Sequence, residues 1–303
     1  MLNFESIEGS NTKVVFHPNP KGIIQLIGGF ISGSFPEHKF KFLLRNLYNQ
    51  GYSLIIYHFP FRPLQFNHWS VAIKILKDLY VVRFEIIKKL FCTSMANEKL
   101  KVYIENKNYF WLGYSLGCKY ILLLELLSND HDSFQRRNQI LRSCLGIENF
   151  QKIKLDIDEA DHYRKMTIKN ISELMGLSCQ INPLIKGQPS LLIAPEINNT
   201  VQIAGKSLAL FSFWDFPSRQ QIQHLIKSST EIFNLMGLIS FNQDKIAEDD
   251  VKFLKCQLQR YNLMPFLHHK LPGKHDYPLK SNVNNLVLHI DTIFQELVKR
   301  QYY

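Results

Sequence analysis

The sequence predicts an α/β fold, a doubly wound and mostly parallel sheet with a lid-like insertion. Three observations predict it: strand and helix patterns alternate through the first 150 residues, the alternation resumes after residue 217, and the segment between is less regular. Such alternation is typical of βαβ units, in which helices cover both faces of a parallel sheet. We therefore expect one core, built from residues 1–150 and 218–303, with an insertion over residues 151–217.

The first half of the chain is expected to contain four strands and three helices. Apolar runs predict the strands, and apolar residues three and four positions apart predict the helices. Gly51 and the sequence FPFRP stand where one helix and one strand are expected to end. The expected strands cover residues 13–17, 22–27, 52–58 and 109–112, and the expected helices cover residues 37–50, 70–90 and 115–127.

The second half begins with the irregular segment. A charged helical stretch, KLDIDEADHYRKMTIKNISELMGL, precedes two β-like runs, SLLIAPEI and SLALFSFW. Beyond it, the strand and helix patterns return, and the last helix has apolar residues along one face. The expected strands there cover residues 235–241 and 264–267, and the expected helices cover residues 219–228, 249–260 and 284–300.

The charge of the chain bears on its partners. There are 36 Lys and Arg against 26 Asp and Glu, which gives a formal net charge of +10. Such a balance favours acidic partners, but these basic residues are dispersed and no RNA-binding or zinc-knuckle motif accompanies them. We expect no nucleic-acid partner and a weak peripheral contact with anionic membrane. The sequence makes no prediction of the oligomeric state.

The cysteines and the apolar segments bear on the compartment. The five cysteines are odd in number and form no CxxC pair, so we expect neither a disulfide framework nor a zinc site, and a reducing compartment inside the cell. The stretch MLNFESIEGSNT predicts neither a secretory signal nor a transit peptide. The most apolar window, residues 109–127, contains Lys119 and Glu125, which favours a buried strand and helix over a membrane span.

Residues 113–117 read Gly-Tyr-Ser-Leu-Gly and join an apolar strand to an apolar helix. A strand–Gly-x-Ser-x-Gly–helix sequence is typical of the nucleophile elbow of α/β-hydrolases, which displays its serine at a strained turn. Small neighbours avoid clashes there, and the helix N-terminus brings N–H groups beside the attacking oxygen. This makes Ser115 the candidate nucleophile. The alternative is a tight turn that merely contains a serine.

A hydrolase elbow requires an oxyanion hole. One N–H comes from the residue after the nucleophile, here Leu116, and another comes from the loop after an earlier strand. Gly28-Gly29-Phe30 follows the strand GIIQLI, where that loop is expected. The second donor would be the backbone N–H of Gly29 or of Phe30.

A catalytic acid and a histidine should follow later strands, in the order Ser, Asp, His. Asp244 comes just after the strand LMGLISF, and His275 lies in a Gly- and Pro-flanked loop before the last helix. Glu196 also ends a strand-like run and is the rival acid. His268 and His269 are rivals to His275, while Asp249 and Asp250 are read as charges at a helix N-terminus.

Together these residues predict acyl transfer without a metal or cofactor. Ser115 would attack an acyl carbon, His275 would carry the proton, and Asp244 would orient the imidazole. The insertion would shape the pocket and exclude water. Its aromatic residues would suit an acyl chain such as that of a lipid, or they are simply core: Phe211, Phe213, Trp214 and Phe216.

The elbow Gly-Tyr-Ser-Leu-Gly-Cys-Lys resembles the α/β-hydrolase superfamily and, more narrowly, an uncharacterised domain-of-unknown-function family of cyanobacteria, algae and plant plastids. Further similar stretches, which cover most of the chain, are IQLIGGFISGSFPEHKFKFLLRNLYNQGYSLI, Phe66-Asn67-His68-Trp69, LISFNQDKI and LPGKHDYPL. The resemblance implies the fold and a serine hydrolase site but no substrate. It also implies a cyanobacterial or plastid setting, the latter for a plastid-encoded protein, with the cytoplasm as the alternative.

Two positions depart from that family pattern, and one of them, Asn67, together with the uncertain choice of the acid, keeps a second class of function open. Tyr114 stands where members tend to have His, and Asn67 stands where they tend to have Asp, so any role of that Asp is in doubt here. The alternative function is a non-catalytic binding or scaffold protein with the same fold.

Overall fold

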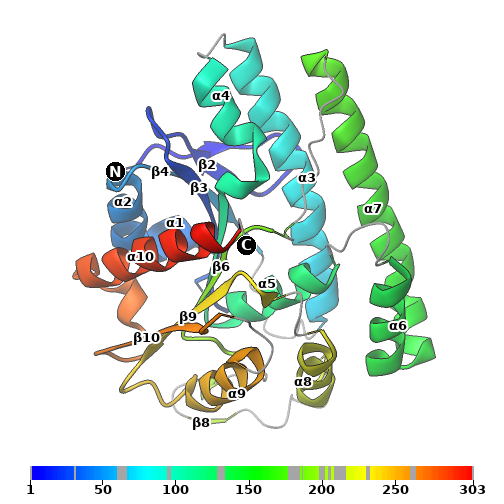
Figure 1. Cartoon of the computed structure of the whole chain (residues 1–303), viewed down its shortest axis with the longest axis vertical. Helices are drawn as coiled ribbons and strands as arrows, with labels where there is room; N and C mark the ends of the chain where they lie inside the picture. The colour runs from blue at the N-terminus through cyan, green and yellow to red at the C-terminus, as the bar shows by residue number, and fades with distance from the viewer. Residues whose placement is uncertain are drawn as a thin grey trace.

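The computed structural model describes residues 2–30, 32–59, 67–93, 97–127, 134–176, 185, 187–197, 202–203, 206–207, 216–229, 233–259 and 264–301. Within these ranges eight strands form one sheet, in the order β1-β2-β4-β3-β5-β6-β9-β10 (Figure 1). The strands are β1 (Glu5–Ser6), β2 (Lys13–Val15), β3 (Gly22–Ile27), β4 (Tyr52–Tyr57), β5 (Tyr109–Tyr114), β6 (Ser190–Ile193), β9 (Met236–Phe241) and β10 (Leu267–Leu271).

Six neighbouring strands, β4, β3, β5, β6, β9 and β10, run parallel, so their carboxyl ends lie together at one edge of the sheet. β1 and β2 pair antiparallel at one edge, and the pairs from β4 through to β10 are parallel. A small separate hairpin joins β7 (Gln202–Ile203) to β8 (Lys206–Ser207). In open α/β sheets, ligands bind outside the carboxyl ends of the strands. The candidate site is therefore expected at that edge.

Helices cover both faces of the sheet, as the sequence predicts. β3 shows why: Ile23 and Ile27 belong to one buried apolar cluster, while Ile24 and Leu26 belong to the other, because alternate side chains of a strand point to opposite faces. α2 and α10 contribute to the second cluster, and α3, α5, α6, α7, α8 and α9 to the first. The helices are α1 (Pro36–Lys39), α2 (Lys41–Asn49), α3 (His68–Cys92), α4 (Asn97–Ile104), α5 (Leu116–Leu127), α6 (Phe134–Leu145), α7 (Ile147–Met175), α8 (Arg219–Ser228), α9 (Glu248–Gln259) and α10 (Asn284–Arg300).

The apolar window at residues 109–127 forms β5 and the wholly buried helix α5, as predicted. Its two charged residues have partners inside the protein. Ser190 Oγ donates to Glu125 Oε1 over 2.9 Å, and Lys119 Nζ donates to the carbonyl oxygen of Pro217 over 3.4 Å. Burial raises the pKa of Glu125 well above its usual value. Among the described helices, none has the length and apolarity that crossing a bilayer requires.

The boundary of the insertion differs from the predicted one. β6 lies in the centre of the sheet between β5 and β9, although residues 151–217 are predicted as an insertion. The preceding part does stand outside the alternating core: α7 packs against α3 and α6 on the outer side of the molecule (Figure 1). β6 is only four residues long and follows a helix of 29 residues, so its apolar run gives a weak signal.

Two other elements differ from the expectation. The predicted strand over residues 264–267 is corrected to β10, whose His268 and His269 pair with β9. Their polar rings fit an edge strand because each has a partner: His268 Nε2 lies 2.8 Å from Ser240 Oγ, and His269 Nδ1 lies 2.8 Å from His289 Nδ1. The predicted helix over residues 37–50 divides into α1 and α2 at Phe40.

The start of α3 explains one of the two unusual positions. Asn67 is the N-cap of α3, and its Oδ1 accepts a hydrogen bond from the backbone N–H of Ser70 over 3.1 Å. Asn and Asp serve equally well as N-caps. Asn67 therefore fulfils a structural task that an Asp at this position would fulfil in the same way. Of the aromatic residues predicted for the insertion, Phe216 is partly buried against the core and the other three lie outside the described residues.

Candidate active site

Ser115 occupies the turn between β5 and α5 in a strained conformation. Its φ is 54°, in the left-handed region that residues other than glycine seldom adopt. The turn is held from the neighbouring strand: the N–H of Ser115 donates to Ile193 O over 3.0 Å, and its carbonyl oxygen accepts from Glu196 N over 3.2 Å. The turn geometry confirms a strained strand-to-helix elbow with the serine at its apex.

Gly117 is required by the contact between α5 and β3. A Cβ added at this position would lie 2.1 Å from the carbonyl oxygen of Ile27 and 2.6 Å from that of Gly28. Both are backbone atoms, which cannot move aside as a side chain can. The second glycine of the motif therefore lets the first turn of α5 approach the loop after β3.

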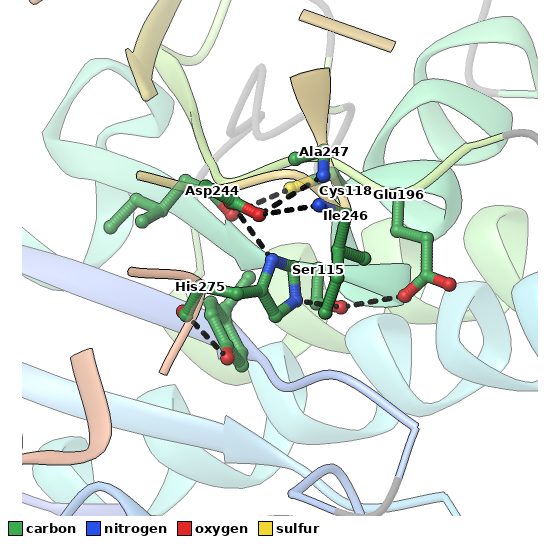
Figure 2. A network of polar contacts seen from close by, with 9 residues as sticks. Ser115, Cys118, Glu196, Asp244, Ile246, Ala247 and His275 are labelled. Carbon is green, nitrogen blue, oxygen red and sulfur yellow. Dashed lines mark hydrogen bonds and ion pairs between the residues drawn. The ribbon is translucent and has the colours of Figure 1, made fainter. Parts of the chain in front are cut away.

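Three side chains from separate segments meet at the carboxyl edge of the sheet (Figure 2). His275 Nε2 lies 2.9 Å from Ser115 Oγ, and His275 Nδ1 lies 2.9 Å from Asp244 Oδ2. Both are hydrogen-bond distances. The structure thus brings together the serine, histidine and aspartate that the sequence singles out. Asp244 and His275 are 31 residues apart in the chain, and Ser115 and His275 are 160 residues apart.

Asp244 is fixed so that one carboxylate oxygen faces the histidine. Its Oδ1 accepts hydrogen bonds from the backbone N–H groups of Ile246 and Ala247, over 3.0 and 3.1 Å, just before α9 begins. Its side chain is only 2% exposed. The remaining oxygen, Oδ2, can therefore hold the imidazole with its Nδ1 protonated and its Nε2 directed at Ser115.

His275 is held in place by two residues that the sequence did not single out for that role. Tyr114 Oη donates to the carbonyl oxygen of His275 over 3.0 Å, and the two rings lie 5.4 Å apart between centroids. Burial, with the nearby carboxylates, raises the pKa of Tyr114, so its hydroxyl stays protonated as a donor. Asn242 Oδ1 accepts from Gly273 N over 3.0 Å and ties the His275 loop to the end of β9. The sequence gives no signal for either contact.

The rival residues lie elsewhere. Glu196 Oε2 lies 2.9 Å from Ser115 Oγ, so this carboxyl contacts the nucleophile and not the imidazole Nδ1. His268 and His269 are on β10 with the partners given above. Asp249 and Asp250 begin α9, as expected of N-terminal charges, and Asp250 Oδ2 also accepts from Ile197 N over 2.6 Å.

One of the predicted oxyanion donors, the N–H of Gly29, already has an acceptor. Leu116 is the first residue of α5, a position where the N–H has no acceptor within the helix. The N–H of Gly29 donates to Ser32 Oγ over 2.8 Å, within its own loop. Gly29 and Phe30 both remain candidates for the second donor. Ser32 is a further residue that the sequence did not single out.

Gly29 matters through its missing side chain. A Cβ there would lie 2.9 Å from Ser115 Cβ and 3.3 Å from Ser115 Oγ. We expect Gly29→Ala to slow acyl transfer about 100-fold, because displacing a reacting atom by about an ångström costs that much. The measurement is the rate of serine labelling by a fluorophosphonate.

Gly237→Ala is the matched control for that prediction. Its Cβ would meet Ile293 Cγ2 at 2.6 Å, an equally tight contact, but near the start of β9 and away from the site. It should lower stability and leave the labelling rate of the folded protein unchanged. Equal labelling rates in Gly29→Ala and wild type would show that Gly29 does not line the nucleophile.

Within the described ranges, no three His, Cys, Asp or Glu side chains gather closely enough to bind a metal ion. The site itself holds a serine hydroxyl at a helix N-terminus, an imidazole in contact with it, and a buried carboxylate behind the imidazole.

The sheet order, the elbow and this arrangement of side chains define an α/β-hydrolase fold. The chain belongs to a family described as "Protein of unknown function (DUF1350)", which it matches over residues 3–175. No curated protein matches it by sequence.

Solved structures with similar folds cover nearly the whole chain. Esterase B from Lactobacillus rhamnosis aligns with a TM-score of 0.56 and 14% identity, over 99% of this chain and 87% of that one. FphF, a fluorophosphonate-binding serine hydrolase from Staphylococcus aureus, aligns with a TM-score of 0.50 and 11% identity, over 95% and 92%. At these identities the likeness establishes the fold.

Proposed function

We propose that the protein is a serine hydrolase that cleaves carboxylic esters or thioesters. The observation that carries the proposal is the continuous contact from Asp244 through His275 to Ser115, made at a strained elbow. The similar solved structures include esterases and a fluorophosphonate-binding serine hydrolase, which supports the same chemistry. The reaction needs no group beyond the protein, the substrate and water.

The steps follow from the geometry. Ser115 Oγ attacks the acyl carbon while His275 Nε2 takes the serine proton, and Asp244 stabilises the imidazolium. The N–H of Leu116, with an N–H of the loop after β3, would stabilise the oxyanion. His275 then protonates the departing alkoxide or thiolate. In the second half, His275 activates water, which attacks the acyl-enzyme and releases the acid and Ser115.

An acyl chain of lipid type is the substrate that we favour. Supporting it, esterase B from Lactobacillus rhamnosis has a structure inhibited by a tributyrin phosphonate, and that structure has a TM-score of 0.55 with this chain. The lid role of the insertion and a weak contact with anionic membrane remain parts of this proposal.

A reducing compartment, either a plastid or the cytoplasm, also belongs to the proposal. Its support is that Cys92, Cys118, Cys144 and Cys256 are free thiols in the structure. The non-catalytic alternative is less well supported, because base and acid both stand at hydrogen-bond distance in the order that catalysis requires.

The test is hydrolysis of p-nitrophenyl esters of increasing acyl length, alongside matching thioesters, by the wild type and Ser115→Ala. We expect hydrolysis by the wild type with an optimum in chain length, and rates near the uncatalysed level for Ser115→Ala. A folded wild type that hydrolyses no ester or thioester faster than Ser115→Ala contradicts the proposal. A faster rate with the oxygen esters would indicate an alkoxide leaving group, and a faster rate with the thioesters would indicate a thiolate.

A further inference from the structure

Glu196 places a second carboxyl directly against the nucleophile. Its Oε2 lies 2.9 Å from Ser115 Oγ, the same distance as His275 Nε2, so the serine oxygen lies between an imidazole and a carboxyl (Figure 2). A working triad accounts for the histidine and Asp244 but not for this contact. The serine hydroxyl has one proton, and it cannot donate that proton to both neighbours at once.

The position of Glu196 is fixed by its backbone. The N–H of Glu196 donates to the carbonyl oxygen of Ser115, and the N–H of Ile197 donates to Asp250 Oδ2 over 2.6 Å. Just before it, Ala194 has a φ of 47° and donates to Ile239 O over 2.9 Å. The ends of the neighbouring strands β5 and β6 thus each have a residue with left-handed backbone, Ser115 and Ala194. Backbone hydrogen bonds from Ser115 N–H to Ile193 O and from Glu196 N–H to Ser115 O join the two ends. The carboxyl is therefore aimed at the serine by the fold.

Two protonation states satisfy the contacts from Glu196 through Ser115 and His275 to Asp244, and they differ in which groups hold the protons. For Ser115 to donate to His275, with His275 Nδ1 donating to Asp244, the contact with Glu196 requires a proton on Glu196. If Glu196 is ionised instead, the serine donates to it, and His275 Nε2 must then donate to the serine as an imidazolium. This second state has the same total number of protons as the first. Its histidine, however, is already protonated on both ring nitrogens and cannot accept the serine proton.

We propose that Glu196 acts as a positioning residue in its protonated form, donating a hydrogen bond to Ser115 Oγ and so directing the serine proton to His275. This inference rests on the proposed serine hydrolase function. The donated bond would hold Oγ in place before attack, and it would leave a lone pair of Oγ free for the acyl carbon once the serine proton passes to His275.

The surroundings of Glu196 favour its neutral form. Burial raises its pKa, and the carboxylates of Asp250 and Asp244 raise it further, whereas His275 and the bond to Ser115 lower it. The other titratable groups around it, Tyr114 and Cys118 at the elbow, are buried with raised pKa values and are uncharged. Among the described residues, His275 is the one basic group that lowers the pKa of Glu196.

The sign of the expected pH dependence follows. As the pH rises through the raised pKa of Glu196, the carboxyl loses its proton and the serine proton turns away from His275. The wild-type labelling rate should therefore fall on the alkaline side, about fivefold over the first pH unit above that pKa and about tenfold over each further unit. A glutamine at this position keeps an N–H donor at every pH.

The experiment measures the rate of fluorophosphonate labelling between pH 5 and pH 10, corrected for spontaneous hydrolysis of the probe, for wild type, Glu196→Gln and Glu196→Ala. We expect Glu196→Gln to match the wild type at neutral pH and to lose the alkaline decline. Glu196→Ala should be about tenfold slower at all pH values, because it has no donor to hold Oγ. A structural role alone would not move the pH profile.

Glu125→Gln is the matched control. Glu125 lies further along α5, and its buried carboxyl is also hydrogen-bonded to a serine, Ser190 of β6. Its pH profile should equal that of the wild type. If Glu196→Gln shows the wild-type alkaline decline, or is slower than wild type at every pH, the inference is wrong while the hydrolase function stands. If the folded wild type takes no label at any pH, both fail.

Discussion

Replacing His275 by alanine is expected to lower the rate of ester hydrolysis and of fluorophosphonate labelling by about 10⁴-fold or more, because removing one member of a serine triad abolishes the benefit of the others. His275 has 16% of its side chain exposed and lies in a surface loop, so the variant should fold. The rates are measured under single-turnover conditions, which separate chemistry from product release.

His268→Ala is the control for that prediction. It removes a histidine from the adjacent strand β10, where the ring bonds to Ser240 and not to Ser115. We expect a labelling rate within about threefold of the wild type, since a residue outside the reacting constellation affects it only indirectly. Similar losses in both histidine variants would mean that the His275 contact with Ser115 is not the catalytic one.

Replacing Gly117 by alanine is expected to destabilise the protein by about 3 kcal/mol or more, an effect at the upper end for overpacking. The cause is the contact of α5 with the carbonyl oxygens of Ile27 and Gly28, into which the new methyl group would project. Either α5 moves outward or the loop after β3 shifts, and the candidate site depends on the positions of both. Urea unfolding of the two proteins measures the free-energy difference.

Gly237→Ala calibrates this prediction, because its methyl group meets the side chain of Ile293 at Cγ2 and no backbone atom. We expect a smaller loss, about 1 to 2 kcal/mol. If Gly117→Ala is no less stable than Gly237→Ala, then backbone contact at the elbow does not govern the packing of α5.

The three triad candidates could be predicted from the sequence because each follows an apolar run that predicts a strand, although the last of these strands lies at Leu267–Leu271 and not at residues 264–267. The elbow has an apolar strand and an apolar helix on its two sides, and Asp244 and His275 are the polar residues just past the next strand ends. Parallel strands bring such residues to one edge whatever their separation in the chain. Their order and their positions after strands therefore singled out Ser115, Asp244 and His275, but left Glu196 open as the acid and His268 and His269 open as the histidine.

Contacts that depend on direction could not be predicted in this way. Glu196 was a rival acid because it also ends a strand, and only the three-dimensional arrangement shows that it contacts Ser115 and not His275 Nδ1. The contact of Tyr114 with His275 depends on how β5 and the last loop are oriented. Ser32 occupies the N–H of Gly29 through a local turn that the pattern of glycines does not reveal.

Intact-mass labelling with a fluorophosphonate shows whether Ser115 is a nucleophile activated by His275. We expect one adduct on the wild type, located on Ser115 by peptide mapping, no adduct on Ser115→Ala, and a greatly slowed adduct on His275→Ala. A folded wild type that takes no label, or a label on another residue that persists in Ser115→Ala, would contradict that role of Ser115.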